Sequence, residues 1–225
     1  MIFSIPIWAD LLAIGIGSLQ GALFAAQFRD RKLDLLGVAI IGIATGFGGG
    51  IIRDLLLSEV PAALEGNWYL PVATGSALIG MLLERLFQRL RHLITVLDAL
   101  TIGLFGAIGT TKALALGLPE IPAIFVGVIS AVGGSILRDL LLNVPIALMS
   151  VGSLYAVAAL FGTTSLVVMV SFGADITLAA VVCVTLTFIV RVLAVLFEWT
   201  LPEQVALRPR KARPIEPGTG NIPLP

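Results

Sequence analysis

The sequence predicts an all-α integral membrane protein with seven transmembrane helices, arranged as two inverted three-helix repeats plus a seventh helix. Two observations predict this class: an apolar composition, and a motif that recurs 85 residues later. Of the 225 residues, 58% are hydrophobic and 12% charged, and the mean hydropathy is +1.05. Soluble domains carry about 25% charged and about 45–50% apolar residues. A soluble domain of this size could not bury so much apolar surface, so we expect the chain to lie in a membrane.

Seven stretches are long and apolar enough to cross a membrane, which takes about 20 residues. In chain order they are 8–27, 34–57, 69–87, 94–115, 119–142, 150–170 and 175–199. Because the connections between them are short, we expect one transmembrane domain over residues 1–199. Its first repeat covers about 8–87, its second about 94–170, and helix seven about 175–199. The start of the chain does not match a cleavable signal, since no basic residue precedes the apolar run and Asp10 interrupts it.

The last segment, 200–225, differs from the rest because it is rich in Pro, Gly and charge, which predicts a disordered tail. Basic residues predict the orientation, since cytoplasmic loops collect Lys and Arg. Ten of the 14 basic residues fall on one side if the N-terminus is outside and the C-terminus cytoplasmic: Arg29, Arg31, Lys32, Arg85, Arg89, Arg91, Arg208, Arg210, Lys211 and Arg213. We therefore expect a multi-pass protein of the plasma (inner) membrane with a cytoplasmic tail.

Charge and the scarcity of reactive side chains exclude several functions. The formal net charge is zero and no basic, aromatic-rich patch is present, so we expect no nucleic-acid partner. Cys183 and His92 are the single cysteine and histidine, which leaves neither a disulfide framework nor a histidine cluster for a metal. We expect no enzymatic activity, and no cofactor beyond permeant K⁺ or Na⁺ and bound membrane lipid.

The repeated motif divides the chain into two halves. TGFGGGIIRDLLL (45–57) and SAVGGSILRDLLL (130–142) align without gaps, and eight of the 13 pairs are identical. The likeness extends outward to these pairs: Asp10 and Asp98, Val60-Pro61 and Val144-Pro145, Tyr69 and Tyr155. Because each repeat contains three helices, an odd number, the second crosses the membrane in the opposite sense to the first. Functional sites in such proteins lie between the repeats, where helices are interrupted by glycine.

The glycines of the motif predict a kink or an unwound segment, because glycine costs about 1 kcal/mol relative to alanine inside a helix. Unwound backbone persists in a membrane only where protein buries it or where it lines a water-filled cavity. Two interpretations follow: a permeation path with carbonyl groups facing cations, or close packing of helix backbones. We favour the path, because two symmetry-matched runs are each followed by Arg-Asp. The candidate residues are Gly48, Gly49, Gly50, Gly133, Gly134 and Ser135.

The intramembrane charges need partners, because unpaired charges in a membrane are costly. Neighbours in sequence point to different helix faces. We therefore expect no ion pair between Arg53 and Asp54, and none between Arg138 and Asp139. Residues at a similar depth in the membrane can pair, which predicts the ion pairs Asp10–Arg53 and Asp98–Arg138, one on each side of the midplane. These pairs could equally be structural staples. Asp54 and Asp139 are then the candidates for pore-facing or helix-end groups.

Lys112 breaks the symmetry, since its counterpart in the first repeat is Phe24. A lysine near a helix end can extend to the lipid headgroups. Alternatively, its charge lies at the mouth of the path, as a gate or as an anchor for an anionic lipid. Arg191 in the seventh span is assigned a structural or lipid-facing role.

At GGGIIRDLLL, GGSILRDLLLNVP and KALALGLP the sequence resembles the trimeric intracellular cation (TRIC) channels in their prokaryotic, UPF0126-like branch, over about residues 8–199. The resemblance implies a homotrimer with a pore inside each protomer, lined by helices two and five kinked at their glycines. Potassium and, less selectively, sodium would pass, and a lysine that maps onto Lys112 would act in gating. The phosphoinositide-binding K-E-V motif of animal members is absent, because Ala113 and Leu114 follow Lys112.

Sequence reasoning leaves two functions open. The first is a cation channel with no covalent chemistry. The alternative is a secondary transporter of a small solute such as an amino acid, because inverted repeats and broken helices are typical of transporters. No Asp or Glu falls at the centre of a span, where proton-coupled carriers often place one, and this favours the channel.

Overall fold

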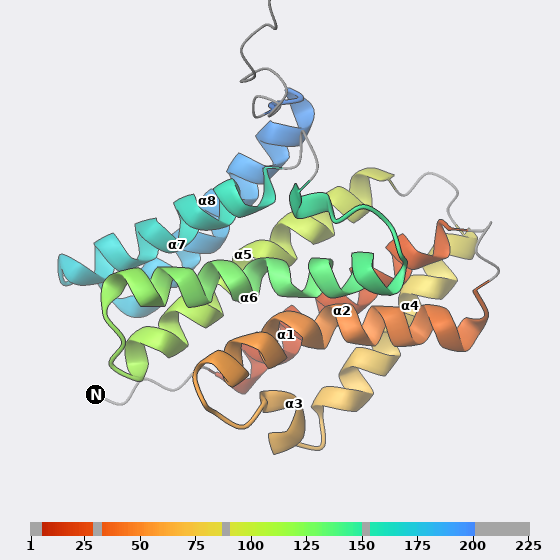
Figure 1. The fold of residues 1–225 in the computed structure, drawn as a ribbon, viewed down its shortest axis with the longest axis horizontal. Helices are drawn as coiled ribbons and strands as arrows, with labels where there is room; N and C mark the ends of the chain where they lie inside the picture. The colour runs from red at the N-terminus through yellow and green to blue at the C-terminus, as the bar shows by residue number, and fades with distance from the viewer. Residues whose placement is uncertain (1–5, 29–32, 87–90, 150–153, 201–225) are drawn as a thin grey trace, which may run out of the picture.

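The structure, a computed structural model, describes residues 6–28, 33–86, 91–149 and 154–200, without the side chains at 85, 86 and 91. The predicted tail therefore lies, from residue 201 onward, outside the described residues, as do most of the basic residues that predict orientation. The elements, drawn in Figure 1, are α1 (Ile7–Ala26), α2 (Leu35–Leu56), α3 (Ala62–Glu65), α4 (Tyr69–Leu86), α5 (Arg91–Ala115), α6 (Glu120–Leu141), the 3₁₀ turn η2 (Ala147–Met149), α7 (Tyr155–Ser171) and α8 (Ile176–Leu196).

Each of the seven predicted spans corresponds to a long helix, and most boundaries agree within three residues. The main difference is α7, which begins at Tyr155 rather than near 150. Among the described residues, five helices (α1, α2, α5, α6 and α8) are long and apolar enough to cross a membrane, whereas the apolar parts of α4 and α7 are shorter. The short α3 and η2 were not expected, and they occupy equivalent places after α2 and α6.

The helices form two groups that meet in the middle of the molecule. In the first group α1 packs against α2 and α4, and in the second α5 packs against α6 and α7. Helix α8 lies against α5 and α7, so it adds to the second group. The two groups meet mainly along α2 and α6, which lie side by side in Figure 1.

Glycines allow the backbones of α2 and α6 to touch. A Cβ added at Gly49 would collide with the carbonyl of Ser130, and one added at Gly134 with the carbonyl of Thr45. Because 49 meets 130 while 45 meets 134, the two helices are antiparallel and the contact is reciprocal. Both helices are continuous through their glycines, so the expected unwinding is wrong. Close packing satisfies the backbone instead, because small residues let two helices approach without breaking their hydrogen bonds.

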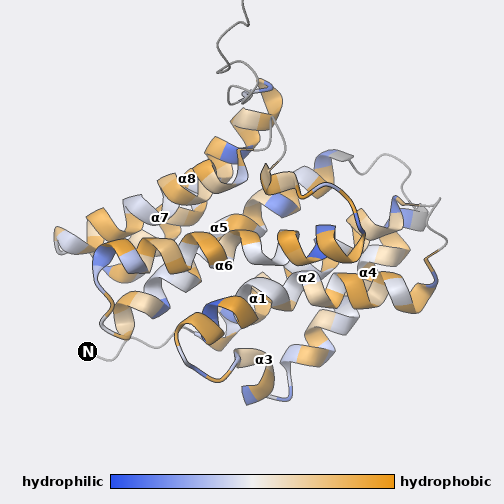
Figure 2. Cartoon of the chain, in the orientation of Figure 1, coloured by the Kyte–Doolittle hydropathy of each residue, from blue (hydrophilic) through white to orange (hydrophobic). Residues whose placement is uncertain are grey.

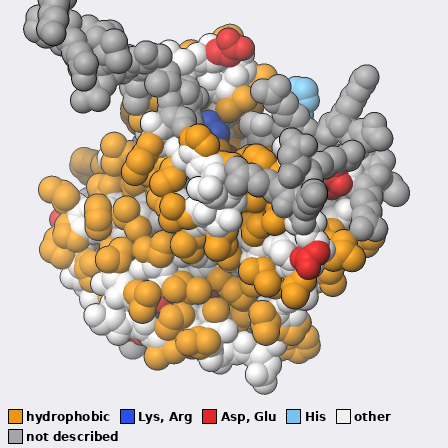
Figure 3. Space-filling model, turned by 45° about the vertical axis from the view of Figure 1, so that its right-hand side comes forward, with side chains coloured by type: hydrophobic (Ala, Val, Ile, Leu, Met, Phe, Trp, Pro, Cys, Tyr) orange, Lys and Arg blue, Asp and Glu red, His pale blue; other side chains and the backbone are white. Residues whose placement is uncertain are grey.

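The outer surface of the helices is apolar. Large hydrophobic side chains stay exposed, such as Ile121 at 80% and Leu36 at 66%. Figure 2 shows hydrophobic residues along the helices, and the face in Figure 3 is mainly hydrophobic. Trp8, Trp68 and Trp199 are exposed at helix ends, where tryptophan is enriched at membrane interfaces. The molecule is thus an all-helical membrane protein with an apolar outer surface and a set of charged residues buried inside it.

Candidate functional site

Two clusters of buried charge lie on opposite sides of the α2–α6 contact. The first cluster consists of Asp10, Arg53, Asp54 and Lys112, and the second of Asp98, Arg138, Asp139 and Arg191. Arg53 and Arg138 each follow the contact glycine by four residues on antiparallel helices, which places them on opposite sides. The side chain of Lys112 is 21% exposed, and the other seven are at most 9% exposed.

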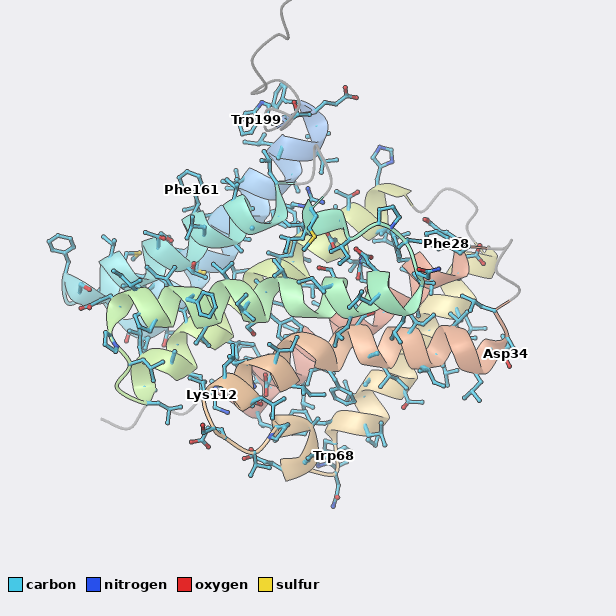
Figure 4. All side chains as sticks on the ribbon, in the orientation of Figure 1. Phe28, Asp34, Trp68, Lys112, Phe161 and Trp199 are labelled. Atoms are coloured by element: carbon cyan, nitrogen blue, oxygen red, sulfur yellow. The ribbon has the colours of Figure 1, made fainter. Side chains whose placement is uncertain are left out.

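The first cluster is fully paired. Arg53 donates from Nε to Asp54 Oδ1 (2.7 Å), from Nη2 to Asp54 Oδ2 (3.0 Å) and from Nη1 to Asp10 Oδ1 (3.4 Å). Lys112 Nζ lies 2.8 Å from Asp54 Oδ1, and Figure 4 shows it beside the C-terminal end of α2. Asp10 also accepts a hydrogen bond from the Tyr69 hydroxyl. Four helices, α1, α2, α4 and α5, are thereby tied together at one end of the crossing.

In the second cluster an arginine again pairs with the aspartate that follows it, but the other contacts of these charges differ. Arg138 donates from Nε and Nη2 to Asp139 Oδ1, at 2.9 and 2.7 Å. Its Nη1 lies 3.9 Å from Asp98 Oδ1, which is an ion pair without a hydrogen bond. Arg191 Nη2 lies 3.4 Å from Asp98 Oδ2, and Gln20 Nε2 donates to Asp98 Oδ1 at 3.3 Å. One carboxylate, Asp98, therefore faces two arginines.

The local sequence explains why both motifs hold their aspartate. After Arg-Asp-Leu-Leu-Leu the chain reverses at Ser58 and Asn143, which adopt positive φ of 57° and 47°. The chain that follows then returns to the aspartate: Ala62 N–H donates to Asp54 Oδ2 at 2.9 Å, and Ala147 N–H to Asp139 Oδ2 at 2.8 Å. Each aspartate thus accepts hydrogen bonds from an arginine and from the backbone N–H at the start of the next helical turn.

The predicted pairs Asp10–Arg53 and Asp98–Arg138 are both present. The prediction that Arg53 does not pair with Asp54, and likewise Arg138 with Asp139, is wrong. The backbone does direct neighbouring side chains to different faces, but an arginine is long enough to curl back to the next residue. Asp54 and Asp139 are 0% and 1% exposed, so they are helix-end groups and do not face an open pore.

Several functional neighbours were missed by the sequence argument. Phe24 lies under the Arg138 guanidinium at 3.9 Å, and Tyr155 lies under that of Arg191 at 3.8 Å. Arg191 is 6% exposed, so the lipid-facing position is wrong, and its structural role stays a prediction. The signal for Phe24 was its alignment with Lys112: each of these residues contacts the cluster of the opposite repeat. Gln20 had no signal, because its aligned residue, Ile108, is apolar.

Fold and site together define a polytopic helical membrane protein of two related halves that meet at paired charge clusters. The family model described as Glycine transporter matches residues 7–85 and again 95–171. An UPF0126 membrane protein of Deinococcus radiodurans is 34% identical over 69% of this chain and 72% of its own. The UPF0126 inner membrane protein YadS of Escherichia coli K12 is 30% identical over 87% of this chain and 94% of its own.

Solved structures also match this chain. A TRIC trimeric intracellular cation channel orthologue from Rhodobacter sphaeroides has a TM-score of 0.79 and 31% identity, over 86% of this chain and 98% of its own. A structure that explains conductance through TRIC cation channels has a TM-score of 0.77 and 30% identity, over 90% and 98%. The chain belongs to this family, that of the UPF0126 membrane proteins and TRIC channels. It is a multi-pass inner-membrane protein, and its family resemblance is confirmed.

Proposed function

We propose that the protein is a channel for monovalent cations, potassium and less selectively sodium, with a path inside each protomer. The observation that carries the proposal is the pair of charge clusters flanking the α2–α6 contact in a fold shared with TRIC cation channels. Buried ionisable groups inside a membrane protein typically mark an ion pathway. The likeness to channels at 30% identity or more favours permeation over an enzymatic role.

The path runs beside the helix contact. Gly48, Gly49, Gly133 and Gly134 have neighbours so close that a Cβ would meet them within 3.0 Å, which leaves no room for an ion between the backbones. The third position of each motif differs, since Gly50 and Ser135 are partly exposed and a Cβ at Gly50 would meet nothing within 3.7 Å. We assign the lining to this pair, and to the other glycines the role of holding the helices together and allowing them to bend.

Phe105 closes the middle of the proposed cation path in this conformation. It is 1% exposed, and its ring carbons would lie 3.5 and 3.9 Å from a Cβ at Gly49 and Gly50. Its counterpart in repeat one is Gly17, and a Cβ added there would meet the backbone of Gly46 first, then Thr101 and the same Phe105 ring. Passage of a cation then requires this ring to move, and Lys112, the exposed member of the first cluster, acts at the mouth.

The arrangement of the chain in the membrane is part of the proposal. The repeats of the family model and the antiparallel, reciprocal α2–α6 contact support two inverted three-helix repeats with α8 as the seventh span. We propose an external N-terminus, a cytoplasmic C-terminus and, by analogy with the trimeric R. sphaeroides channel, a homotrimer in contact with membrane lipid.

Recording from purified protein in planar bilayers with a potassium gradient tests the channel. We expect discrete unitary currents that reverse near the potassium potential and shift only partly when sodium replaces potassium. A membrane that stays silent, although the protein runs as a single trimeric species in detergent, contradicts the proposal.

A carrier for glycine is the second candidate, and the description of the matching family favours it. Uptake into proteoliposomes separates the two functions. A carrier gives saturable glycine accumulation without unitary currents, whereas a channel gives currents and no glycine uptake above that of protein-free liposomes.

A further inference from the structure

A cavity of about 200 Å³ adjoins the second cluster. It lies where α1 ends and α5 begins, since its lining includes Gln27 at the end of α1 and Ile94 near the start of α5. Arg138, Arg191 and Asp98 line its inner wall. Gln27 is exposed whereas the charged residues are buried, so the cavity leads from the protein surface to the charges.

Three guanidinium nitrogens at this cavity lack a hydrogen-bond acceptor among the described residues. They are Nη1 of Arg138 and both Nε and Nη1 of Arg191, each fully buried. Buried donors of this kind, when charged, are costly to leave unsatisfied, so native proteins supply an acceptor. No atom of Arg53 or Lys112 in the first cluster is in this position.

The cavity lining contains two arginines but only one carboxylate, Asp98. Asp139 uses Oδ1 for Arg138 and Oδ2 for the N–H of Ala147, so its oxygens are committed. Asp98 alone faces both arginines, and it already accepts from Gln20. Phe24 and Tyr155 each cover one face of a guanidinium, which leaves its edge, where the N–H groups lie, as the direction for a further ligand.

We propose that this cavity binds one oxyanion group, a carboxylate or a phosphate, through the edges of Arg138 and Arg191. Guanidinium groups match both anions in a planar, bidentate geometry. The group can come from a soluble anion or from the headgroup of an anionic lipid at the same membrane face. The site goes beyond the proposed channel function, since it is a binding site for an ion of the opposite charge.

Calorimetric titration of the full-length protein in neutral detergent tests the site, with inorganic phosphate and acetate as separate probes. We expect saturable binding of at least one of them. Gln27→Glu places a carboxylate at the mouth without touching a buried charge, and it should weaken binding about ten-fold by competing for the arginines and repelling the anion. Arg191→Gln, which removes two of the three free donors, should abolish binding.

Lys112→Gln is the matched control, because it removes a cation from the paired first cluster and should leave affinity within about two-fold. Repeating the titration in nanodiscs of phosphatidylcholine with and without phosphatidylglycerol identifies the source. Loss of phosphate binding only with phosphatidylglycerol supports the lipid headgroup, and binding in both supports a soluble anion. The absence of saturable binding in detergent, or equal binding by wild type and Gln27→Glu, overturns the proposal. Because binding is measured rather than current, either result leaves the channel proposal intact.

Discussion

The two charge clusters share a motif and differ in how completely they are paired. In the first, Arg53 bonds two carboxylates through three nitrogens and Lys112 adds a second cation to Asp54. In the second, Asp98 serves two arginines, three of whose nitrogens lack an acceptor among the described residues, and a cavity adjoins them. The two repeats thus share an arginine that pairs with two aspartates, whereas the second cation differs: it is Lys112 of α5 in the first cluster and Arg191 of α8 in the second.

The largest expected effect comes from the shared carboxylate. Asp98→Asn leaves Arg138 with one partner and Arg191 with no carboxylate, and breaking a buried ion pair typically costs about 3–5 kcal/mol. Asp10→Asn affects only the longest of the three Arg53 bonds and the neutral hydrogen bond from Tyr69, so we expect about 1–3 kcal/mol. Unfolding in mixed micelles with increasing sodium dodecyl sulfate measures both variants. Equal losses would show that the clusters are energetically alike despite their different pairing.

Substitution of a contact glycine should destabilise the protein to a similar extent on α2 and on α6. Gly49→Ala and Gly134→Ala each press a methyl group against a backbone carbonyl of the opposite helix. Overpacking of this kind typically costs about 1–3 kcal/mol. Gly75→Ala is the matched control in α4, because nothing lies within 4 Å of its added Cβ. The same unfolding assay applies, and a stable Gly49→Ala beside a destabilised Gly134→Ala would refute the reciprocal contact.

Lys112 should affect current far more than stability. Asp54 keeps both Arg53 bonds and the N–H of Ala62 when Lys112 is replaced by methionine, and a partly exposed ion pair contributes about 0–1 kcal/mol. We expect an altered open probability in bilayer recordings with a nearly unchanged unfolding midpoint. Leu140→Met, at an exposed position of α6 outside both clusters, is the control that should leave gating unaltered. Unchanged currents in Lys112→Met would remove the lysine from the mouth of the path.

The sequence predicted the helices and the long-range pairs, because hydropathy and an internal repeat depend on composition and alignment alone. Asp10–Arg53 followed from equal depth in adjacent spans. The sequence could not predict the reach of a side chain, which lets Arg53 return to Asp54. It also could not predict neighbours without a matching residue in the other repeat, such as Arg191 and Gln20. The glycine runs were ambiguous for a physical reason: the same absence of Cβ permits both unwinding and close packing, and only the opposite helix decides between them.

The central claim, a cation path beside the α2–α6 contact, is tested most directly by cysteine block. Cys183 is the single cysteine and is buried, so Cys183→Ala provides a background for Ser135→Cys. Leu140→Cys is the control on the outer surface, because the native side chain is 55% exposed. The account predicts that a cationic methanethiosulfonate reagent reduces the unitary current of the Ser135→Cys channel and leaves the Leu140→Cys channel unchanged. Modification of Ser135→Cys without any change in current would contradict a path at this position.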